Sequence, residues 1–310
     1  MNFVEFIKTV ESDIFKYLPV SYSNMTTEVS RVSKPGYSYM GLRIYDPSDS
    51  SVNVFPILDL NKAYESYVTE QDLRKTLLNI AETYINVISH MPAGINKHMN
   101  ASDFVDFEKV QNKIVMRLIN TNDNKALLSN MPHREFNDLS IIYKIVVSKE
   151  NEAISTVEIT NNMMQQMDVS EDVLYSNAVE NTKRIYGFEV QTMFDIMNQY
   201  MSSEELYAMD NDMWIFSNKK RMNGAVVMIL YKSEFKAFAN KQGSNLYILP
   251  SSVHELIVIP ENRLGNIDMT LSGLKSMVEE VNKEEVSSED KLSDSVYYYD
   301  RVQDNIVRLC

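Results

Sequence analysis

The sequence of 310 residues contains a single cysteine, Cys310, which is its last residue. A lone thiol cannot form a disulfide within the chain, and such cysteine usage is typical of a reducing compartment. No apolar run reaches the roughly 18 residues that a membrane-spanning helix needs. The amphipathic first helix also lacks the basic segment and small-residue cleavage site of a signal peptide. We therefore expect a cytoplasmic protein that does not enter a membrane.

Glycine is scarce, with eight in the chain, and no two of them are separated by one residue. Neither the G-x-G-x-x-G fingerprint of dinucleotide-binding proteins nor a phosphate-binding glycine loop can be written. The sequence also lacks G-x-S-x-G, H-E-x-x-H, a cysteine metal cluster and an EF-hand loop. These absences predict no cofactor and no metal, and they favour a protein that is not an enzyme.

The sequence has 43 acidic residues and only 30 lysines and arginines, so its formal net charge is −13. Since phosphate backbones are bound by lysine and arginine, this balance argues against a nucleic-acid partner. An acidic surface suits a basic surface on another protein, which makes a protein the expected partner. The oligomeric state is left open.

What the sequence does contain is a series of β-rich runs joined by short polar connections, which is typical of hairpins. The expected pairs are 37–44 with 52–58, 139–147 with 154–159, and 214–216 with 225–230 around Asn223-Gly224. Single strands are expected at 246–249 and 256–259. Apolar residues at helical spacing predict helices at 3–18, 60–89, 170–183, 188–201, 233–241 and 271–282. We predict an α+β fold of largely antiparallel sheets with packed helices, either one compact domain or two lobes, 1–150 and 151–310.

Two segments concentrate chemistry-bearing side chains. In the first, His133 with Glu135 or Asp138 could act as a base and its orienting group, or as metal ligands. The alternative is a turn in which the charged residues form local caps and ion pairs. In the second, His254 and Glu255 enter an apolar strand, where neighbouring side chains point to opposite faces. A hydrogen-bonded histidine at the start of that strand is the alternative to a catalytic one.

Several motifs together resemble an uncharacterised domain-of-unknown-function family that is abundant in gut-dwelling clostridia. The residues that carry the resemblance are PHREFNDL at 132–139, LYILPSSVHE at 246–255 and LSDSVYYYDR at 292–301. The resemblance implies a bacterial cytoplasmic protein of about this length and implies no activity. It also implies that residues 284–301 belong to the folded domain.

Two functional hypotheses follow. The first is a binding or interaction protein without catalysis, and the second is a hydrolase or metal-assisted enzyme that uses His133 and His254 with nearby carboxylates. If the two histidines share a cleft, the second hypothesis gains support. If each is held separately by its own structural partners, the first gains support.

Overall fold

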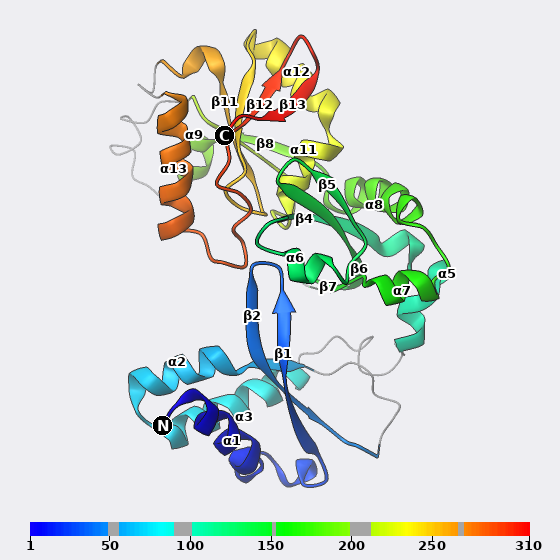
Figure 1. The fold of residues 1–310 in the computed structure, drawn as a ribbon, viewed down its shortest axis with the longest axis vertical. Coiled ribbons are helices and arrows are strands. Elements are labelled where there is room, and N and C mark those ends of the chain that lie inside the picture. The colour runs from blue at the N-terminus through cyan, green and yellow to red at the C-terminus, as the bar shows by residue number, and fades with distance from the viewer. Residues whose placement is uncertain (49–55, 90–100, 151–152, 199–211, 266–269) are drawn as a thin grey trace. The chain divides into compact units, whose positions relative to one another are not determined.

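A computed structural model describes residues 1–48, 56–89, 101–150, 153–198, 212–265 and 270–310 (Figure 1). Tertiary contacts divide the chain into two compact units. Unit 1 comprises residues 1–109 and 147–155, and unit 2 comprises residues 110–146 and 156–310. The sequence analysis divides the chain at residue 150, whereas the packing assigns residues 110–146 to unit 2. No described helix is long and apolar enough to cross a membrane.

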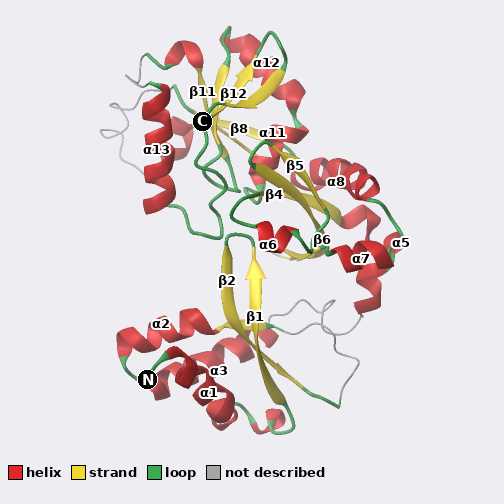
Figure 2. Ribbon diagram, in the orientation of Figure 1, coloured by secondary structure: helices red, strands yellow, loops and turns green. Residues whose placement is uncertain are grey.

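Among its described residues, unit 1 combines a three-stranded antiparallel sheet with the helices α1, α2 and α3 (Figure 2). The strands are β1 (Thr26–Lys34), β2 (Tyr37–Tyr45) and β3 (Ile57–Asp59), in the order β1-β2-β3. The helices are α1 (Phe3–Asp13), α2 (Leu60–Glu70) and α3 (Leu73–Ser89). The predicted apolar stripe of the first helix is confirmed, since Phe6, Val10 and Ile14 are fully buried in the core of this unit. Of the hairpin expected to join 37–44 and 52–58, residues 52–55 lie outside the described part of the chain.

The single helix predicted at 60–89 is wrong, because two helices occupy this segment. Helix α2 ends at Glu70, and Gln71 adopts the left-handed conformation with φ of 55°. Asp72 then accepts a hydrogen bond from the N–H of Lys75, which satisfies a donor in the first turn of α3. The two helices therefore fold back against each other instead of continuing in line.

Two further antiparallel sheets belong to unit 2, except for the ends of β6 and β7 within 147–155, which are assigned to unit 1. In the four-stranded sheet, β6 (Leu139–Glu150) pairs with β4 (Ile114–Asn120), β5 (His133–Phe136) and β7 (Ala153–Glu158). The six-stranded sheet has the order β13-β12-β10-β11-β9-β8. Its strands are β8 (Glu189–Thr192), β9 (Trp214–Ser217), β10 (Leu246–Leu249), β11 (Leu256–Pro260), β12 (Tyr297–Asp300) and β13 (Asn305–Arg308). The predicted α+β class with antiparallel sheets is confirmed.

Helices pack on these sheets. The longer ones are α8 (Glu171–Tyr186), α12 (Lys232–Gln242) and α13 (Leu271–Glu284), each close to its predicted range. The shorter ones are α6 (Lys125–Leu128), α7 (Asn161–Gln166), α9 (Met193–Met197) and α11 (Val227–Leu230). Helix α5 (Phe107–Val110) lies where the chain passes from unit 1 to unit 2. Helix α8 is fixed to β4 by hydrogen bonds, because Thr182 accepts from the N–H of Met116 and Asn181 donates to the carbonyl of Ile114.

Two predicted elements of unit 2 are wrong. Residues 225–230 form a 3₁₀ turn and the short helix α11 instead of a strand. Four of the residues in this run are almost completely buried, and a fully buried apolar run has no period that separates strand from helix. The helix expected at 188–201 begins as strand β8 and becomes helical only at Met193, while residues 199–201 lie outside the described part.

Candidate functional site

His133 lies on β5, and its side chain is oriented by the main chain. The Nδ1 atom is 2.9 Å from the carbonyl oxygen of Met131, so Nδ1 carries the proton and donates. Among the described residues, no hydrogen bond engages Nε2. Glu135 is exposed two residues further along the strand, where it shares a face with His133. The pair is thus on one face, without a hydrogen bond between them.

The arginine between these two residues has a structural role. Arg134 forms ion pairs with Glu171 and Asp172 in the first turn of α8, and its guanidinium lies 3.9 Å from the ring centre of Tyr175. The buried Tyr143 hydroxyl donates to Glu171 as well. Hydrogen bonding to Glu171 raises the pKa of Arg134. This cluster ties the start of α8 to β5 and β6, whereas the sequence analysis expected local ion pairs within a turn.

Asp138 is the most enclosed of the candidate carboxylates, with 8% of its side chain exposed. It accepts hydrogen bonds from Ser293 at 2.7 Å, from Ser295 at 3.0 Å and from the Tyr297 hydroxyl. The Nε atom of Arg308 lies 3.8 Å away. Burial acts to raise the pKa of Asp138, but these hydrogen bonds outweigh it and hold the pKa below its usual value. Asp138 is therefore an anchored anion rather than a proton acceptor.

His254 is also fully engaged. Its Nε2 is 3.0 Å from Asp290 Oδ1, and its Nδ1 is 3.3 Å from the main-chain nitrogen of Asn223. Because a main-chain N–H can only donate, Nδ1 is the acceptor and Nε2 carries the proton that is donated to Asp290. The Ser217 hydroxyl donates to the His254 carbonyl at 2.7 Å. Both ring nitrogens thus connect segments of the chain, and neither is left for a substrate.

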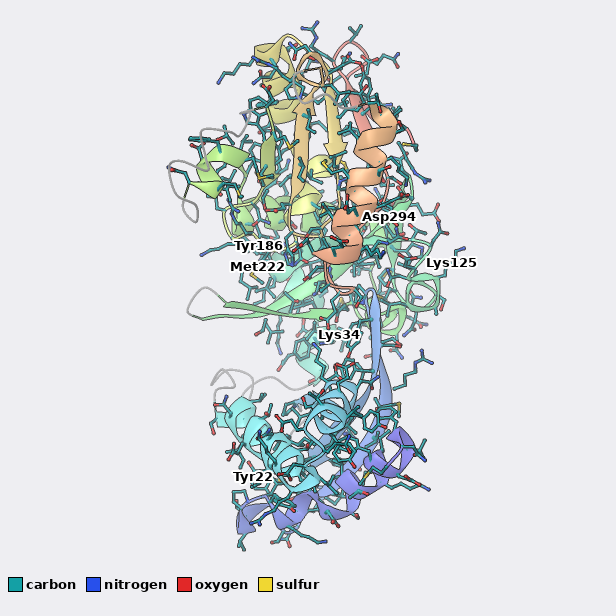
Figure 3. The ribbon with its side chains drawn as sticks, turned by 90° about the vertical axis from the view of Figure 1, so that its left-hand side faces the viewer. Tyr22, Lys34, Lys125, Tyr186, Met222 and Asp294 are labelled. Atoms are coloured by element: carbon teal, nitrogen blue, oxygen red, sulfur yellow. The ribbon has the colours of Figure 1, made fainter. Side chains whose placement is uncertain are left out.

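The three sequence motifs meet in unit 2. The main chain at 250–253 runs beside 290–293, with hydrogen bonds from Val253 to Asp290, from Leu292 to Ser251 and from Ser293 to Pro250, at 2.8, 2.8 and 3.0 Å. Asp294, labelled beside α13 in Figure 3, accepts a hydrogen bond from Asn282 of that helix. This junction places residues 284–301 within the fold, as the resemblance implied.

The structure does not join the candidate residues into one site. Asp138 belongs to the junction through Ser293, and His254 belongs to it through Asp290. His133 and Glu135 share no hydrogen-bond partner with either of them. In the described ranges, no group of three or more His, Cys, Asp or Glu side chains is placed to hold a metal ion. Each histidine is held by its own partners.

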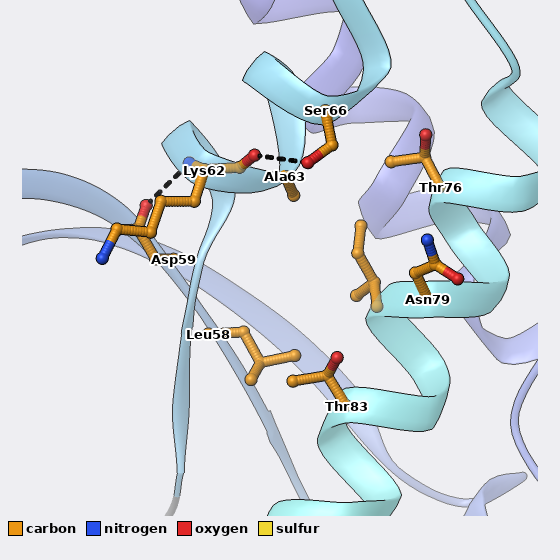
Figure 4. A pocket seen from close by; sticks show the side chains of 9 residues that line it. Leu58, Asp59, Lys62, Ala63, Ser66, Thr76, Asn79 and Thr83 are labelled. Carbon is orange, nitrogen blue, oxygen red and sulfur yellow. Dashed lines mark hydrogen bonds between the residues drawn. The ribbon is translucent and has the colours of Figure 1, made fainter. Parts of the chain in front are cut away.

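A cleft that the sequence analysis missed lies in unit 1, between α2, α3 and β3 (Figure 4). We call it the α2–α3 cleft, and its volume is about 290 Å³. Its lining consists of Leu58, Asp59, Lys62, Ala63, Ser66, Thr76, Asn79, Ile80 and Thr83. On a single continuous helix these side chains could not face one another. The three consecutive polar residues Glu70, Gln71 and Asp72 are the feature of the sequence that could have predicted the break between α2 and α3.

Most polar groups of the cleft are committed within the protein. Asp59 accepts hydrogen bonds from the N–H groups of Asn61 and Lys62 and from the Tyr37 hydroxyl. Ser66 donates to the Lys62 carbonyl, and Thr76 donates to the Asp72 carbonyl. By contrast, Asn79 and Thr83 are exposed, and no hydrogen bond of their side chains is found in the described part of the chain. These two side chains remain available to a ligand.

The protein has an α+β fold with antiparallel sheets in two compact units. The first unit carries a small cleft whose lining residues are mostly uncharged. The chain belongs to the family of unknown function DUF5688, whose model matches residues 3–301. No curated protein and no solved structure matches it. The predicted membership in a domain-of-unknown-function family is confirmed.

Proposed function

We propose that this protein is a non-catalytic binding protein of the bacterial cytoplasm and that its ligand occupies the α2–α3 cleft. The observation that carries the proposal is the cleft itself. The apolar residues Leu58, Ala63 and Ile80 form its floor, and the other six lining residues carry polar side chains. Sites for small ligands are concave and combine apolar surface with polar groups that orient the ligand, and the volume of about 290 Å³ lies just below their usual range.

The chemistry of the candidate residues supports binding over catalysis. A general base needs an unoccupied lone pair within reach of a substrate proton. His254 uses both ring nitrogens, and Asp138 accepts three hydroxyl hydrogen bonds. One observation favours the enzyme alternative: the Nε2 atom of His133 is not engaged by a described residue, and Glu135 lies on the same face of β5.

The test is to fill the cleft with a larger side chain and to measure whether small fragments still bind. A library of uncharged and charged fragments would be screened against the full chain by ligand-observed NMR. Thr83→Leu places a larger apolar side chain at the rim, and Thr69→Leu is the matched control on an exposed helical threonine outside the cleft. We expect fragments that bind the native protein and the control but lose most of their affinity for Thr83→Leu.

Two results would refute the proposed site. One is the absence of any bound fragment at millimolar concentration. The other is a set of bound fragments whose affinities are equal in Thr83→Leu and Thr69→Leu. A shared unfolding midpoint for the two variants would establish that differences in affinity do not come from differences in folding.

A further inference from the structure

The lining of the α2–α3 cleft forms two facing stripes. On the α2 side the lining positions are 59, 62, 63 and 66, and on α3 they are 76, 79, 80 and 83. Each set spans eight residues, or seven steps along the chain, at the spacing of one helix face. With a rise of about 1.5 Å per residue, each stripe is about 10 Å long. An extended chain advances by about 3.3 Å per residue, so the cleft matches roughly three residues of such a chain.

The hydrogen-bonding groups of the cleft are complementary to peptide groups. The hydroxyls of Ser66 and Thr76 donate their protons to their own helices, which leaves them as acceptors for N–H groups. Asn79 offers an amide with both a donor and an acceptor, and Thr83 offers a hydroxyl that can do either. A ligand that satisfies this set needs N–H donors and carbonyl acceptors close together, as a main chain has them.

The charges of the lining do not favour an ionic ligand. Asp59 already accepts hydrogen bonds from three donors of the protein. The Lys62 side chain runs towards Asp59 and away from Asn79 and Thr83 (Figure 4), and its ammonium lies 5.7 Å from the ring centre of Tyr37. Burying an ion without a counter-charge is costly, whereas an uncharged amide needs only hydrogen bonds. The apolar floor suits a small apolar side chain.

We propose that the α2–α3 cleft binds an extended, uncharged peptide segment of about three residues through its main chain. This inference rests on the proposed function and names the ligand class of the same site. The peptide lies along the groove between the helices, with a peptide group opposite Asn79 and a small apolar side chain on the floor formed by Leu58 and Ile80.

The probe is the blocked tripeptide N-acetyl-Ala-Ala-Ala-N-methylamide, titrated into the isotope-labelled full chain and followed by amide chemical shifts. We expect saturable shifts at α2 and α3. A net hydrogen bond contributes roughly a two- to tenfold change in affinity. Asn79→Leu and Thr83→Val should each weaken binding by at least that factor, and Thr69→Val should leave it unchanged. An ester analogue that lacks the central N–H should bind roughly two- to tenfold more weakly.

The outcomes separate this inference from the proposed function. Equal affinity of the peptide and its ester analogue, or undiminished binding to Asn79→Leu, would overturn main-chain recognition. If the tripeptide does not bind at millimolar concentration while fragments bind and are excluded by Thr83→Leu, the cleft is a ligand site and the peptide inference is wrong. If neither binds, both proposals fail.

Discussion

Replacing Asp138 by alanine is expected to destabilise unit 2 strongly. The substitution removes the acceptor of three hydroxyl hydrogen bonds and leaves the Tyr297 hydroxyl, on a residue with 0% exposure, without its partner. A buried polar group that loses its partner costs about 1–3 kcal/mol, and the two serine hydrogen bonds add to this. Because the three bonds share one carboxylate and are not additive, we expect a total loss of about 3–5 kcal/mol.

The assay is urea-induced unfolding monitored by tryptophan fluorescence. Trp214 is the only tryptophan of the chain and lies in β9, so its signal reports on unit 2. Asp123→Ala is the matched control, since Asp123 is exposed and its side chain has no described partner. Its effect should stay within about 0.5 kcal/mol. A loss below about 1 kcal/mol for Asp138→Ala would refute the role given to this carboxylate.

The pH dependence of this effect has a definite sign. The pKa of Asp138 is lower in the folded protein than its usual value, which is about 3.9 in an unfolded chain. The contribution of its ionisation is therefore present above about pH 4 and is lost as the pH falls through the folded pKa. The stability difference between the native protein and Asp138→Ala should shrink below pH 4, and a difference that stays constant would contradict this explanation.

Three further predictions concern other positions. Gly224→Ala would place a Cβ 2.1 Å from the His254 carbonyl oxygen and should cost about 3 kcal/mol in the same urea assay, while Gly265→Ala, with open space around it, should be neutral. Tyr84→Phe removes a buried hydrogen bond to the Ile44 carbonyl and should lower the stability of unit 1 by about 1 kcal/mol by hydrogen exchange. Burial raises the pKa of Tyr84 to about 12, so the contribution of its neutral hydroxyl to stability should be present below about pH 10 and fade as the pH rises above that value. His133→Gln should leave fragment binding at the α2–α3 cleft unchanged, and a loss of binding would point to a role that β5 does not explain.

The sequence predicted those elements whose signal is local. The stripe Phe6, Val10 and Ile14 repeats at helical spacing, and the structure buries all three residues. The strand predicted at 225–230 is wrong because all residues of this apolar run except Ile229 are buried, so a strand and a helix give the same apolar pattern. The break at Gln71 was not predicted, because one residue in the left-handed conformation does not interrupt the apolar period around it.

Prediction of the candidate site was limited in the same way, because its contacts join residues that are far apart in the sequence. Asp138 was identified as a chemistry-bearing residue, but its partner Ser293 is 155 residues away in the sequence. Nothing in the local pattern indicates which distant hydroxyls a carboxylate will meet. The α2–α3 cleft depends in turn on the fold-back of two helices, and its polar residues look like an ordinary solvent-exposed face when the helices are considered in line.

The wide sequence separation between Asp138 and its hydroxyl partners also sets an order of events on the ribosome. The strands and helices of the first sheet are complete once residue 89 has left the exit tunnel. The six-stranded sheet needs β12 and β13, which end at Arg308. Until those strands emerge, the Asp138 carboxylate has none of its serine and tyrosine donors. During synthesis the sheet and helices within residues 1–89 can therefore form early, while the six-stranded sheet depends on residues 297–308, and chains stalled before those residues would present its unfinished edge to chaperones and proteases.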